Sequence, residues 1–343
     1  MFELGVAPGV TFFEGERRGR FPFGNVLLLE GRDARLLVDT GAGDEVLEAV
    51  LGRGPVHIVF NTHYHIDHVR GNARFRGAVF WCPEGEAGAF SSEEEFFQLS
   101  GWDLVGTETA RSVLSGLGWR PTPVARELAD GEVLDLGGLS AAVVRLPGHT
   151  PGHSGLVLED KGILFTADID FSRFGPWYGD VHSSVDDYLA SVRRLTALAA
   201  AGPGFETVLT SHRRPLTREA FAAGLAAFEN HFELREEKVL SVLAAEGPLT
   251  LTELTARWPI YGPRSELHPG LYKAEFFMLQ HHLDRLARAG KVERVPGAAG
   301  SATDGAGPES VPGAAERGSA PEAAGPGSDR VDSYGGGDLW RKR

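Results

Sequence analysis

The chain has 343 residues, 42% of them hydrophobic, and its 34 Lys and Arg against 47 Asp and Glu give a formal charge of −13. This length and composition exclude a single minimal domain and wholesale disorder, and the acidic balance argues against a surface that collects nucleic acid by charge alone. A single cysteine, Cys82, excludes an intrachain disulfide and a cysteine metal cluster. It fits a reducing compartment, so we expect a cytoplasmic protein. No apolar run approaches the roughly 20 residues of a membrane-spanning helix, so we expect no membrane partner.

Short β-rich runs separated by Gly, Pro or Asp fill the chain from Val10 to about Asp170 and predict a sheet-rich region. The runs are VTFF, NVLLLEG, ARLLVDTG, PVHIVFNTH, AVFWC, GEVLDL, LSAAVVRLPG, SGLVLED and GILFTAD. Several are apolar throughout, as expected of strands covered on both faces, and helical patterns also occur at 44–51 and 185–198. Helices layered over two sheets would satisfy this pattern.

Beyond His212 the pattern becomes helical, first over 216–245, then within LTLTELTARW, and again over 271–289 before the β-like run KVERV. Three helices and a β wing predict a small winged-helix domain over 231–297, after a first domain over 1–230. The segment 298–343 is rich in Gly, Ala, Pro and Ser and has few large apolar residues. Because such a segment cannot offset its ordering entropy, we expect a disordered tail there.

The main chemical signal is NTHYHIDH at residues 61–68, directly after the apolar run HIVF. A strand that breaks into a turn there lets His63 and His65 point into one pocket, with Asp67 and His68 on its other side. Imidazole and carboxylate ligands suit zinc, iron or manganese, and the lack of thiolates leaves that choice open. The alternative, a set of capping and core histidines, does not require four such side chains within six residues.

Three further candidate ligands follow other apolar runs: His149 in RLPGHTPGHS, Asp168 in GILFTADID and His212 in TVLTSH. Each lies just beyond a predicted strand, where a loop can present it to a shared cleft. Taken singly, a strand-end His is more often structural and a strand-end Asp more often caps a turn. Their joint order with the 61–68 motif supplies the specificity.

These residues in this order resemble the metallo-β-lactamase-fold hydrolase superfamily over about residues 5–225. The resemblance implies an α+β fold, a four-layer αββα sandwich, with two divalent metal ions between the sheets, Zn²⁺ foremost and iron or manganese as alternatives. One ion would be held by His63, His65 and His149, the other by Asp67, His68 and His212, with Asp168 bridging the two. Asp39 in LLVDTG matches the early aspartate that supports the metal loop, while Thr62 and His153 would be supporting residues and not ligands.

Differences within the superfamily narrow the expected function. True β-lactamases of this fold generally lack the bridging aspartate found here as Asp168, and persulfide dioxygenases lose the second-metal ligands that Asp67 and His68 would supply. The full set resembles glyoxalase II, lactonases and RNase Z. The C-terminal segment resembles the winged-helix module of the lactamase-β-2-like subfamily, which includes endoribonucleases and thioesterases. Because Lys and Arg balance Asp and Glu in that segment, a packed cap is favoured over a nucleic-acid reader.

We therefore expect a dinuclear metallohydrolase that uses a metal-bridging hydroxide on a small ester or thioester, with Asp67 orienting the hydroxide and moving its proton. One alternative is a metal-dependent single-strand endoribonuclease, which would need a basic path from the site to the wing. Another is a winged-helix regulator whose lactamase-like domain only senses a ligand. Arg173, Trp177 and Tyr178 in FSRFGPWYGD would line the substrate entrance or pack the domain junction. The sequence leaves the oligomeric state open.

Overall fold

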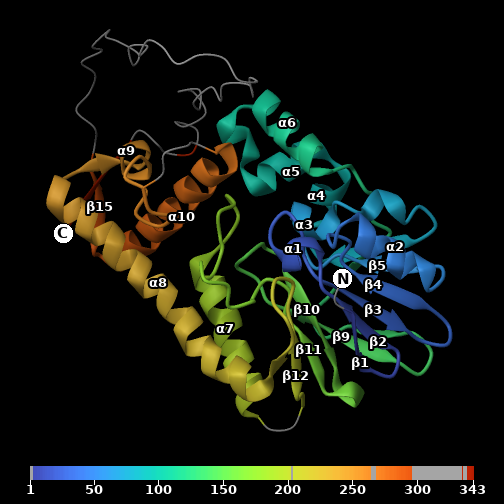
Figure 1. The fold of residues 1–343 in the computed structure, drawn as a ribbon. Coiled ribbons are helices and arrows are strands. Elements are labelled where there is room, and N and C mark those ends of the chain that lie inside the picture. The colour runs from blue at the N-terminus through green and yellow to red at the C-terminus, as the bar shows by residue number, and fades with distance from the viewer. Residues whose placement is uncertain (1–2, 202–203, 264–267, 296–333, 335–337) are drawn as a thin grey trace.

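A computed structural model of the chain describes residues 3–201, 204–263, 268–295, 334 and 338–343. Two β-sheets pack face to face, and helices cover their outer faces (Figure 1). The predicted four-layer αββα arrangement of an α+β protein is confirmed. The predicted β-rich runs each contain a strand, and the two predicted early helices correspond to α2 (Asp44–Gly52) and α7 (Val185–Ala200).

The first sheet has seven strands in sequential order. They are β1 (Glu3–Ala7), β2 (Val10–Phe13), β3 (Val26–Glu30), β4 (Arg35–Val38), β5 (Ile58–Phe60), β6 (Val79–Pro83) and β7 (Arg126–Leu128). Strands β1 to β4 are antiparallel neighbours, and β4 to β7 are parallel. The parallel part needs crossover connections, and α2 supplies the one between β4 and β5.

The second sheet has six strands in the order β13-β12-β11-β10-β9-β8. They are β8 (Val133–Asp135), β9 (Ser140–Arg145), β10 (Ser154–Leu158), β11 (Ile163–Phe165), β12 (Thr207–Leu209) and β13 (Leu216–Thr217). All neighbours are antiparallel except β11 and β12, which α7 connects as a crossover helix. Helix α7 begins where the Ser184 hydroxyl accepts a hydrogen bond from the backbone of Asp187, a serine cap.

Strand β3 shows how the apolar runs fill two layers at once. Successive side chains of a strand point to opposite faces of the sheet. Leu27 and Leu29 lie in the core between the two sheets, whereas Val26 and Leu28 belong to the cluster under α2. Both faces of this strand are therefore buried, which explains why its sequence is apolar throughout instead of alternating.

Shorter helices lie between the strands, and several of them pack beside the sandwich around the Phe90 and Phe96 cluster. They are α1 (Glu16–Gly19), α3 (Ile66–Val69), α4 (Ala87–Ser91), α5 (Glu93–Ser100) and α6 (Thr107–Leu117), with 3-10 turns η1 (Asn72–Arg74), η2 (Trp102–Val105) and η3 (Glu159–Lys161). Within the described ranges, no helix combines the length and the apolar character that crossing a bilayer requires.

The C-terminal elements are joined to the sandwich by the long helix α8 (Arg218–Glu246). The domain boundary that we predicted at residue 230 falls inside this unbroken helix, which extends along α7 and on toward α10 (Figure 1). The other elements are β14 (Leu249–Thr250), α9 (Leu251–Thr255), α10 (Pro269–Arg288), β15 (Val292–Val295) and β16 (Leu339–Lys342). The three helices and the β-like run lie where the sequence patterns predicted them, and the winged-helix domain over 231–297 stays a prediction.

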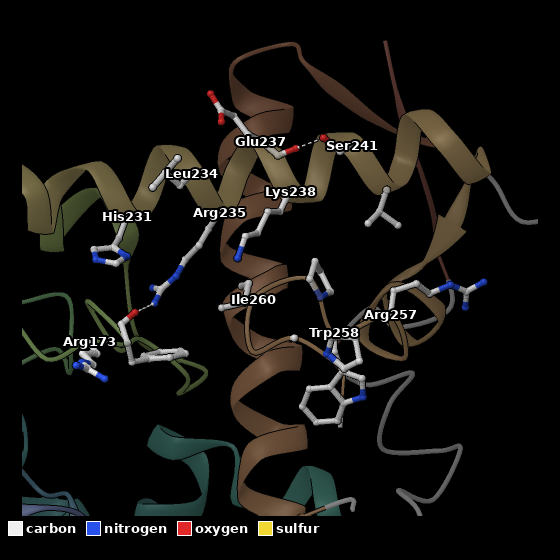
Figure 2. Close-up of a pocket in the computed structure, with 15 residues that line it drawn as sticks. Arg173, His231, Leu234, Arg235, Glu237, Lys238, Ser241, Arg257, Trp258 and Ile260 are labelled. Atoms are coloured by element: carbon white, nitrogen blue, oxygen red, sulfur yellow. Dashed lines mark hydrogen bonds between the residues drawn. The ribbon is translucent and has the colours of Figure 1, made fainter. Parts of the chain in front are cut away.

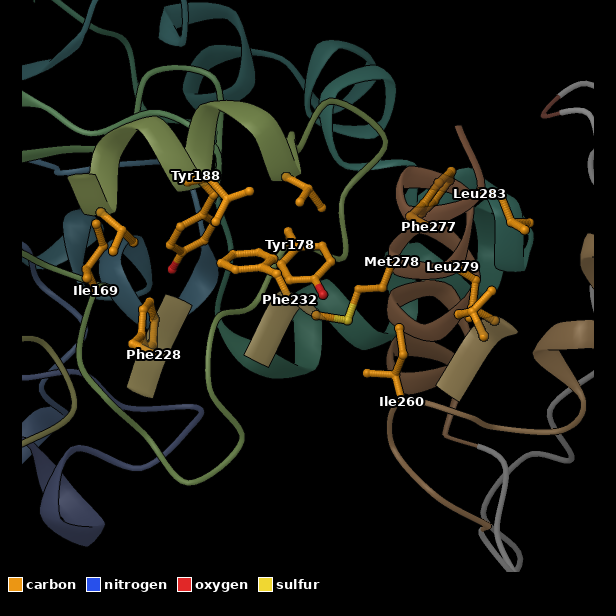
Figure 3. Packing of buried hydrophobic residues seen from close by; sticks show 14 of the residues in the cluster. Ile169, Tyr178, Tyr188, Phe228, Phe232, Ile260, Phe277, Met278, Leu279 and Leu283 are labelled. Atoms are coloured by element: carbon orange, nitrogen blue, oxygen red, sulfur yellow. The ribbon is translucent and has the colours of Figure 1, made fainter. Parts of the chain in front are cut away.

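One hydrophobic cluster continues from the outer face of the second sheet into the C-terminal elements. Tyr188 of α7, Phe228 and Phe232 of α8, and Phe277 and Met278 of α10 are all buried in it (Figure 3). The rings of Tyr178 and Phe232 stack with their centroids 5.2 Å apart. The C-terminal elements therefore share a hydrophobic core with the sandwich, because the large apolar side chains of the facing helices are buried against one another.

The predicted disordered tail is wrong at its last residues. Strand β16 lies between β14 and β15 and pairs antiparallel with both. Its Trp340 is only 2% exposed. The prediction rested on the average composition of 298–343, which does not reveal the short LWRK run at its end. The buried ring of Trp340 stabilises the pairing of this run as a strand. The rest of the predicted tail, 298–333 and 335–337, lies outside the described residues.

Candidate metal centre

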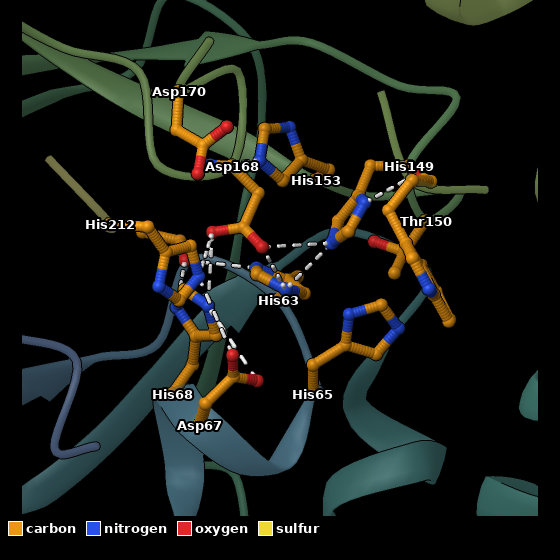
Figure 4. A network of polar contacts seen from close by, with 12 residues as sticks. His63, His65, Asp67, His68, His149, Thr150, His153, Asp168, Asp170 and His212 are labelled. Atoms are coloured by element: carbon orange, nitrogen blue, oxygen red, sulfur yellow. Dashed lines mark hydrogen bonds and ion pairs between the residues drawn. The ribbon is translucent and has the colours of Figure 1, made fainter. Parts of the chain in front are cut away.

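All seven side chains that the sequence predicts as ligands converge in one cluster (Figure 4). Their candidate ligand atoms form two groups, and within each group these atoms lie within 4.8 Å of one another. The first group is His63, His65, His149 and Asp168, and the second is Asp67, His68, Asp168 and His212. Only Asp168 belongs to both. The structure thus reproduces the expected grouping of side chains that are far apart in the sequence.

The loop after β5 and the short helix α3 carry four of these residues. Asn61 ties the strand end to α3 by donating from Nδ2 to the carbonyl oxygen of His68 over 3.1 Å. The same carbonyl accepts the backbone N–H of Thr40 over 2.7 Å. Gly41 allows this approach, because a Cβ at that position would overlap the carbonyl oxygen of Asp67. The DTG turn and the histidine motif are therefore one packed unit.

Asp39 orients His68, as expected of a residue that supports the metal loop. Its Oδ2 lies 2.8 Å from His68 Nδ1, which donates to it, and its two oxygens also accept the backbone N–H and hydroxyl of Thr62 at 2.8 and 2.9 Å. This leaves Nε2 of His68 to face the cluster. Asp39 has a backbone φ of 61°, in the left-handed region that residues other than glycine rarely adopt and that recurs at functional sites.

Asp180 plays the corresponding role for His65, and no motif in the sequence indicates this role. His65 Nε2 donates to Asp180 Oδ2 over 2.7 Å, and the hydroxyl of Tyr64 donates to the same oxygen over 2.7 Å. Nδ1 of His65 is therefore the nitrogen left for the cluster. Lys273 of α10 forms an ion pair with Oδ1. Although burial opposes the charged form, the positive charge of Lys273 and the hydrogen bond from His65 hold the pKa of Asp180 well below its usual range.

His149 and His212 are each oriented by a backbone carbonyl. His149 Nδ1 donates to the oxygen of Trp177 over 2.7 Å, and His212 Nδ1 donates to that of Gly19 over 2.6 Å. Both rings then present Nε2 to Asp168, at 3.3 Å and 3.4 Å from its nearer oxygen. Carbonyl hydrogen bonds of this kind fix the tautomer of a metal-binding histidine.

His153 positions Asp168 and has no nitrogen left for a metal ion. Its Nε2 accepts the backbone N–H of Asp168 over 3.1 Å, and its Nδ1 donates to the carbonyl of Leu146 over 2.9 Å. Burial lowers the pKa of His153 to about 3, so the ring is neutral, as these two bonds require. The expectation that His153 supports the site without being a ligand agrees with these contacts.

The donor atoms fit divalent cations. Nε2 of His68 and Oδ1 of Asp168 lie 3.0 Å apart, yet each is buried without a well-formed hydrogen bond to any residue that the structure describes. Burial disfavours the charged form of His212, but the carboxylates of Asp168 and Asp67 raise its pKa to about 10. The carboxylates of the second group therefore stabilise positive charge beside them, and nitrogen and carboxylate oxygen are ligands that zinc accepts.

The three residues that we expected at a substrate entrance lie in different places. The indole of Trp177 lies edge-on to the rings of His65 and His149, with centroid distances of 5.0 and 5.5 Å. Tyr178 is fully buried, and its hydroxyl bonds His282 Nε2 at 2.7 Å and accepts from Arg235 at 3.0 Å. The substrate-lining prediction for Tyr178 is therefore wrong, and the packing alternative holds.

Arg173 lines a separate groove of about 890 Å³ between the 173–174 turn, α8 and the segment 257–263 (Figure 2). None of the seven cluster residues lines this groove. Arg173 is exposed there, whereas Arg235 of α8 is buried and donates to the carbonyl oxygens of Phe174 and Pro176, both at 2.6 Å. The structure therefore leaves Trp177 as the only one of the three predicted substrate residues beside the cluster.

Comparison with known proteins identifies relatives in the superfamily that the ligand residues resemble. The sequence-family model of the metallo-beta-lactamase superfamily matches residues 19–201 of this chain. The chain is 31% identical over 259 residues to a hydroxyacylglutathione hydrolase of Methylococcus capsulatus, covering 72% of this chain and 87% of that protein. It is 28% identical over 227 residues to the human acyl-coenzyme A thioesterase MBLAC2, covering 59% of this chain and 75% of that protein.

A solved structure resembles the chain beyond the sandwich. A metallo-beta-lactamase family protein of Thermus thermophilus superposes with a TM-score of 0.62 at 25% sequence identity, covering 85% of this chain and 97% of that one. Because 85% of the chain cannot fit within residues 1–217, the similarity includes part of the C-terminal elements.

Proposed function

The chain belongs to the metallo-β-lactamase superfamily of hydrolases, and from that premise we propose that it uses two divalent metal ions to hydrolyse a small thioester. The observation that carries the proposal is the position of Asp168. Its Oδ1 lies 3.0 Å from His68 and 3.4 Å from His212, while its Oδ2 lies 3.3 Å from His149 and 4.0 Å from His63. One carboxylate oxygen faces each group of ligands, so Asp168 could contribute to holding both ions.

The first ion would be held by His63, His65 and His149, the second by Asp67, His68 and His212, and both by Asp168. We propose Zn²⁺ for both, because the donors are imidazole nitrogen and carboxylate oxygen and the family typically binds zinc. When bound, such a pair of cations supplies the Lewis acidity that makes water a nucleophile near neutral pH.

Asp67 is the residue that we propose to act on the attacking water. Its Oδ2 lies 3.4 Å from His212 Nε2, and it is 6% exposed. The side chains of His65, Asp168 and His212 retain 13%, 11% and 16% of their exposure, whereas those of His63 and His68 are fully buried. Water and substrate would therefore approach from the side of the first three residues, where the Asp67 carboxylate can orient the water and accept its proton.

The relatives favour a thioester over an oxygen ester or RNA. The names of both curated relatives denote hydrolysis of a thioester, one of glutathione and one of coenzyme A. Trp177, beside His65 and His149, offers an apolar wall for the acyl group. The net charge of −13 gives no general attraction for RNA.

A panel of substrates tests this proposal. The chain would be stripped of metal with a chelator, reloaded separately with Zn²⁺, Mn²⁺ or Fe²⁺, and assayed on lactoylglutathione, short and long acyl-coenzyme A, p-nitrophenyl acetate and single-stranded RNA. We expect the fastest turnover on a thioester, only after reloading, with two ions per chain by elemental analysis. Asp67→Ala should bind substrate yet lose turnover. Turnover without metal, one bound ion at saturation, or a preference for RNA would each contradict the proposal.

A further inference from the structure

Lys273 is a buried lysine on the C-terminal helix α10. It is 1% exposed, on a helix that also buries Phe276 and Phe277. Its ammonium group lies 5.4 Å from the ring centroid of Trp102, 5.5 Å from that of Trp177 and 6.0 Å from that of Phe277. A charged lysine is almost never buried unless it is paired, so its partners indicate what keeps it there.

The partners of Lys273 lie in the sandwich, beside the metal centre. Its Nζ donates to the carbonyl oxygen of Ser100 over 2.7 Å and forms an ion pair with Oδ1 of Asp180. A second residue of the same helix, His281, donates from Nε2 to the carbonyl oxygen of Asp180 over 2.8 Å. Two side chains of α10 therefore hold one aspartate, one through its carboxylate and the other through its backbone.

Asp180 transmits this contact to the cluster by two routes. Its Oδ2 accepts from His65 Nε2 over 2.7 Å, which fixes the plane of the imidazole ring and directs Nδ1 inward. Its backbone N–H donates to the hydroxyl of Ser183, which in turn donates to the carbonyl oxygen of His149 over 2.8 Å. His65 and His149 belong to the same group of candidate ligands. The contacts of Asp180 thus reach only one half of the centre directly.

We propose that Lys273 is a positioning residue of the metal centre, which fixes Asp180 and through it His65, so that α10 determines the affinity for the ion held by His63, His65 and His149. This inference rests on the proposed two-metal function. Partners that orient a metal-binding histidine typically change metal affinity by about 10–100-fold when they are removed. A lysine that only joins α10 to the sandwich would change stability, and would not select one ion over the other.

Metal affinity separates the two roles. Lys273→Met in the full chain removes the ammonium group and keeps an unbranched side chain, and the affinities for two Zn²⁺ ions can be measured by competition with a chromophoric chelator. We expect one ion to bind about 10–100-fold more weakly and the other to change by less than about threefold. Asp180→Asn should weaken the same ion. In Co²⁺-loaded protein, the absorption spectrum of one site should change and that of the other should not.

Glu236→Gln is the matched control. Glu236 of α8 pairs with Arg285 of α10 and is 5% exposed, so the substitution removes one contact of α10 and leaves both the Lys273–Asp180 ion pair and the candidate ligands in place. It should lower the unfolding temperature and leave both metal affinities unchanged. If Lys273→Met does not fold by circular dichroism, Lys273→Gln replaces it, because its amide can still donate to Ser100.

Two results would overturn the inference: both affinities of a folded Lys273 variant within about threefold of the parent, or both ions weakened equally, as a loosened fold would produce. If the parent chain binds two ions and hydrolyses a thioester while the variants keep both affinities, only the role of Lys273 fails. If the parent chain binds fewer than two ions, the two-metal function fails first.

Discussion

The two halves of the metal centre are supported from opposite ends of the chain. His68 is held by Asp39, which follows β4 and contacts Thr62 just after β5 of the same sheet. His65 is held by Asp180, which is itself held by Lys273 of α10. The two carboxylates are equally buried, at 1% exposure each. They leave different nitrogens free, Nε2 in His68 and Nδ1 in His65.

Two ligands of the same type can therefore be oriented by contacts of very different sequence separation, one local and one long-range. The support of His68 is complete once the first sheet has formed, because Asp39, Thr62 and His68 all lie within residues 39–68. The support of His65 is complete only when α10 has packed against the sandwich. The half that depends on α10 can therefore be altered from outside the sandwich, whereas the contacts of Asp39 with Thr62 and His68 lie within the first sheet and the loop after β5.

The largest expected effect comes from removing the residue that both halves share. Asp168→Ala deletes one carboxylate oxygen from each group of ligands. We expect loss of at least one bound ion and a fall in turnover of about 1,000-fold or more, because several kcal/mol of transition-state stabilisation depend on the cations. Elemental analysis and steady-state kinetics measure both quantities. Two ions per chain in this variant would remove Asp168 from the proposed bridge.

A second variant loosens only the distant support. Trp340→Ala truncates the buried ring of β16, and large-to-small changes of this kind cost about 3–5 kcal/mol. Because β16 pairs with β15, and β15 packs on α10, we expect hydrogen exchange in 269–288 to speed up while β3 and β4 keep their protection. Mass spectrometry of deuterium uptake checks this. Equal acceleration in β3 and α10 would show that the two regions unfold together.

The smallest expected effect comes from the local support. Asp39→Asn keeps the size of the side chain and tolerates the left-handed backbone, but it weakens the acceptor for His68 Nδ1. We expect the ion near His68 to bind about 10-fold more weakly and the ion near His65 to be unaffected, the reverse of the pattern for Lys273→Met. Chelator competition on both variants makes the comparison. The same ion weakened in both would mean that the halves are not independently supported.

The sequence was sufficient for residues whose role is written in a local pattern. His63, His65, Asp67 and His68 stand within six positions after an apolar run, and His149, Asp168 and His212 each follow a strand. Their convergence was predicted from this order together with its resemblance to the metallo-β-lactamase fold. The burial of both faces of β3 was likewise implied by an apolar run of strand length. Residue spacing within a short motif and the positions of strand ends can both be read from the sequence.

Asp180 and Lys273 could not be predicted in the same way, because their contact joins two segments that no shared motif connects. The one available signal was Lys273 itself, a charge close to Phe276 and Phe277 on one helix. The prediction that Tyr178 lines the substrate entrance was wrong for a related reason. An aromatic residue next to Trp177 can face a cleft or a helix, and only the position of α8 and α10 decides between them.

The central position of β16 also sets the order of events during protein synthesis. Strands β14 and β15 have β16 between them, so neither gains its hydrogen bonds to that strand until residues 339–342 have left the ribosome. A nascent chain that ends before these residues holds α10 beside an incomplete sheet. If α10 determines the affinity for one ion, that ion can bind fully only after β16 has been synthesised. Chains truncated by a stop codon just before residue 339 should therefore bind one ion well and the other poorly.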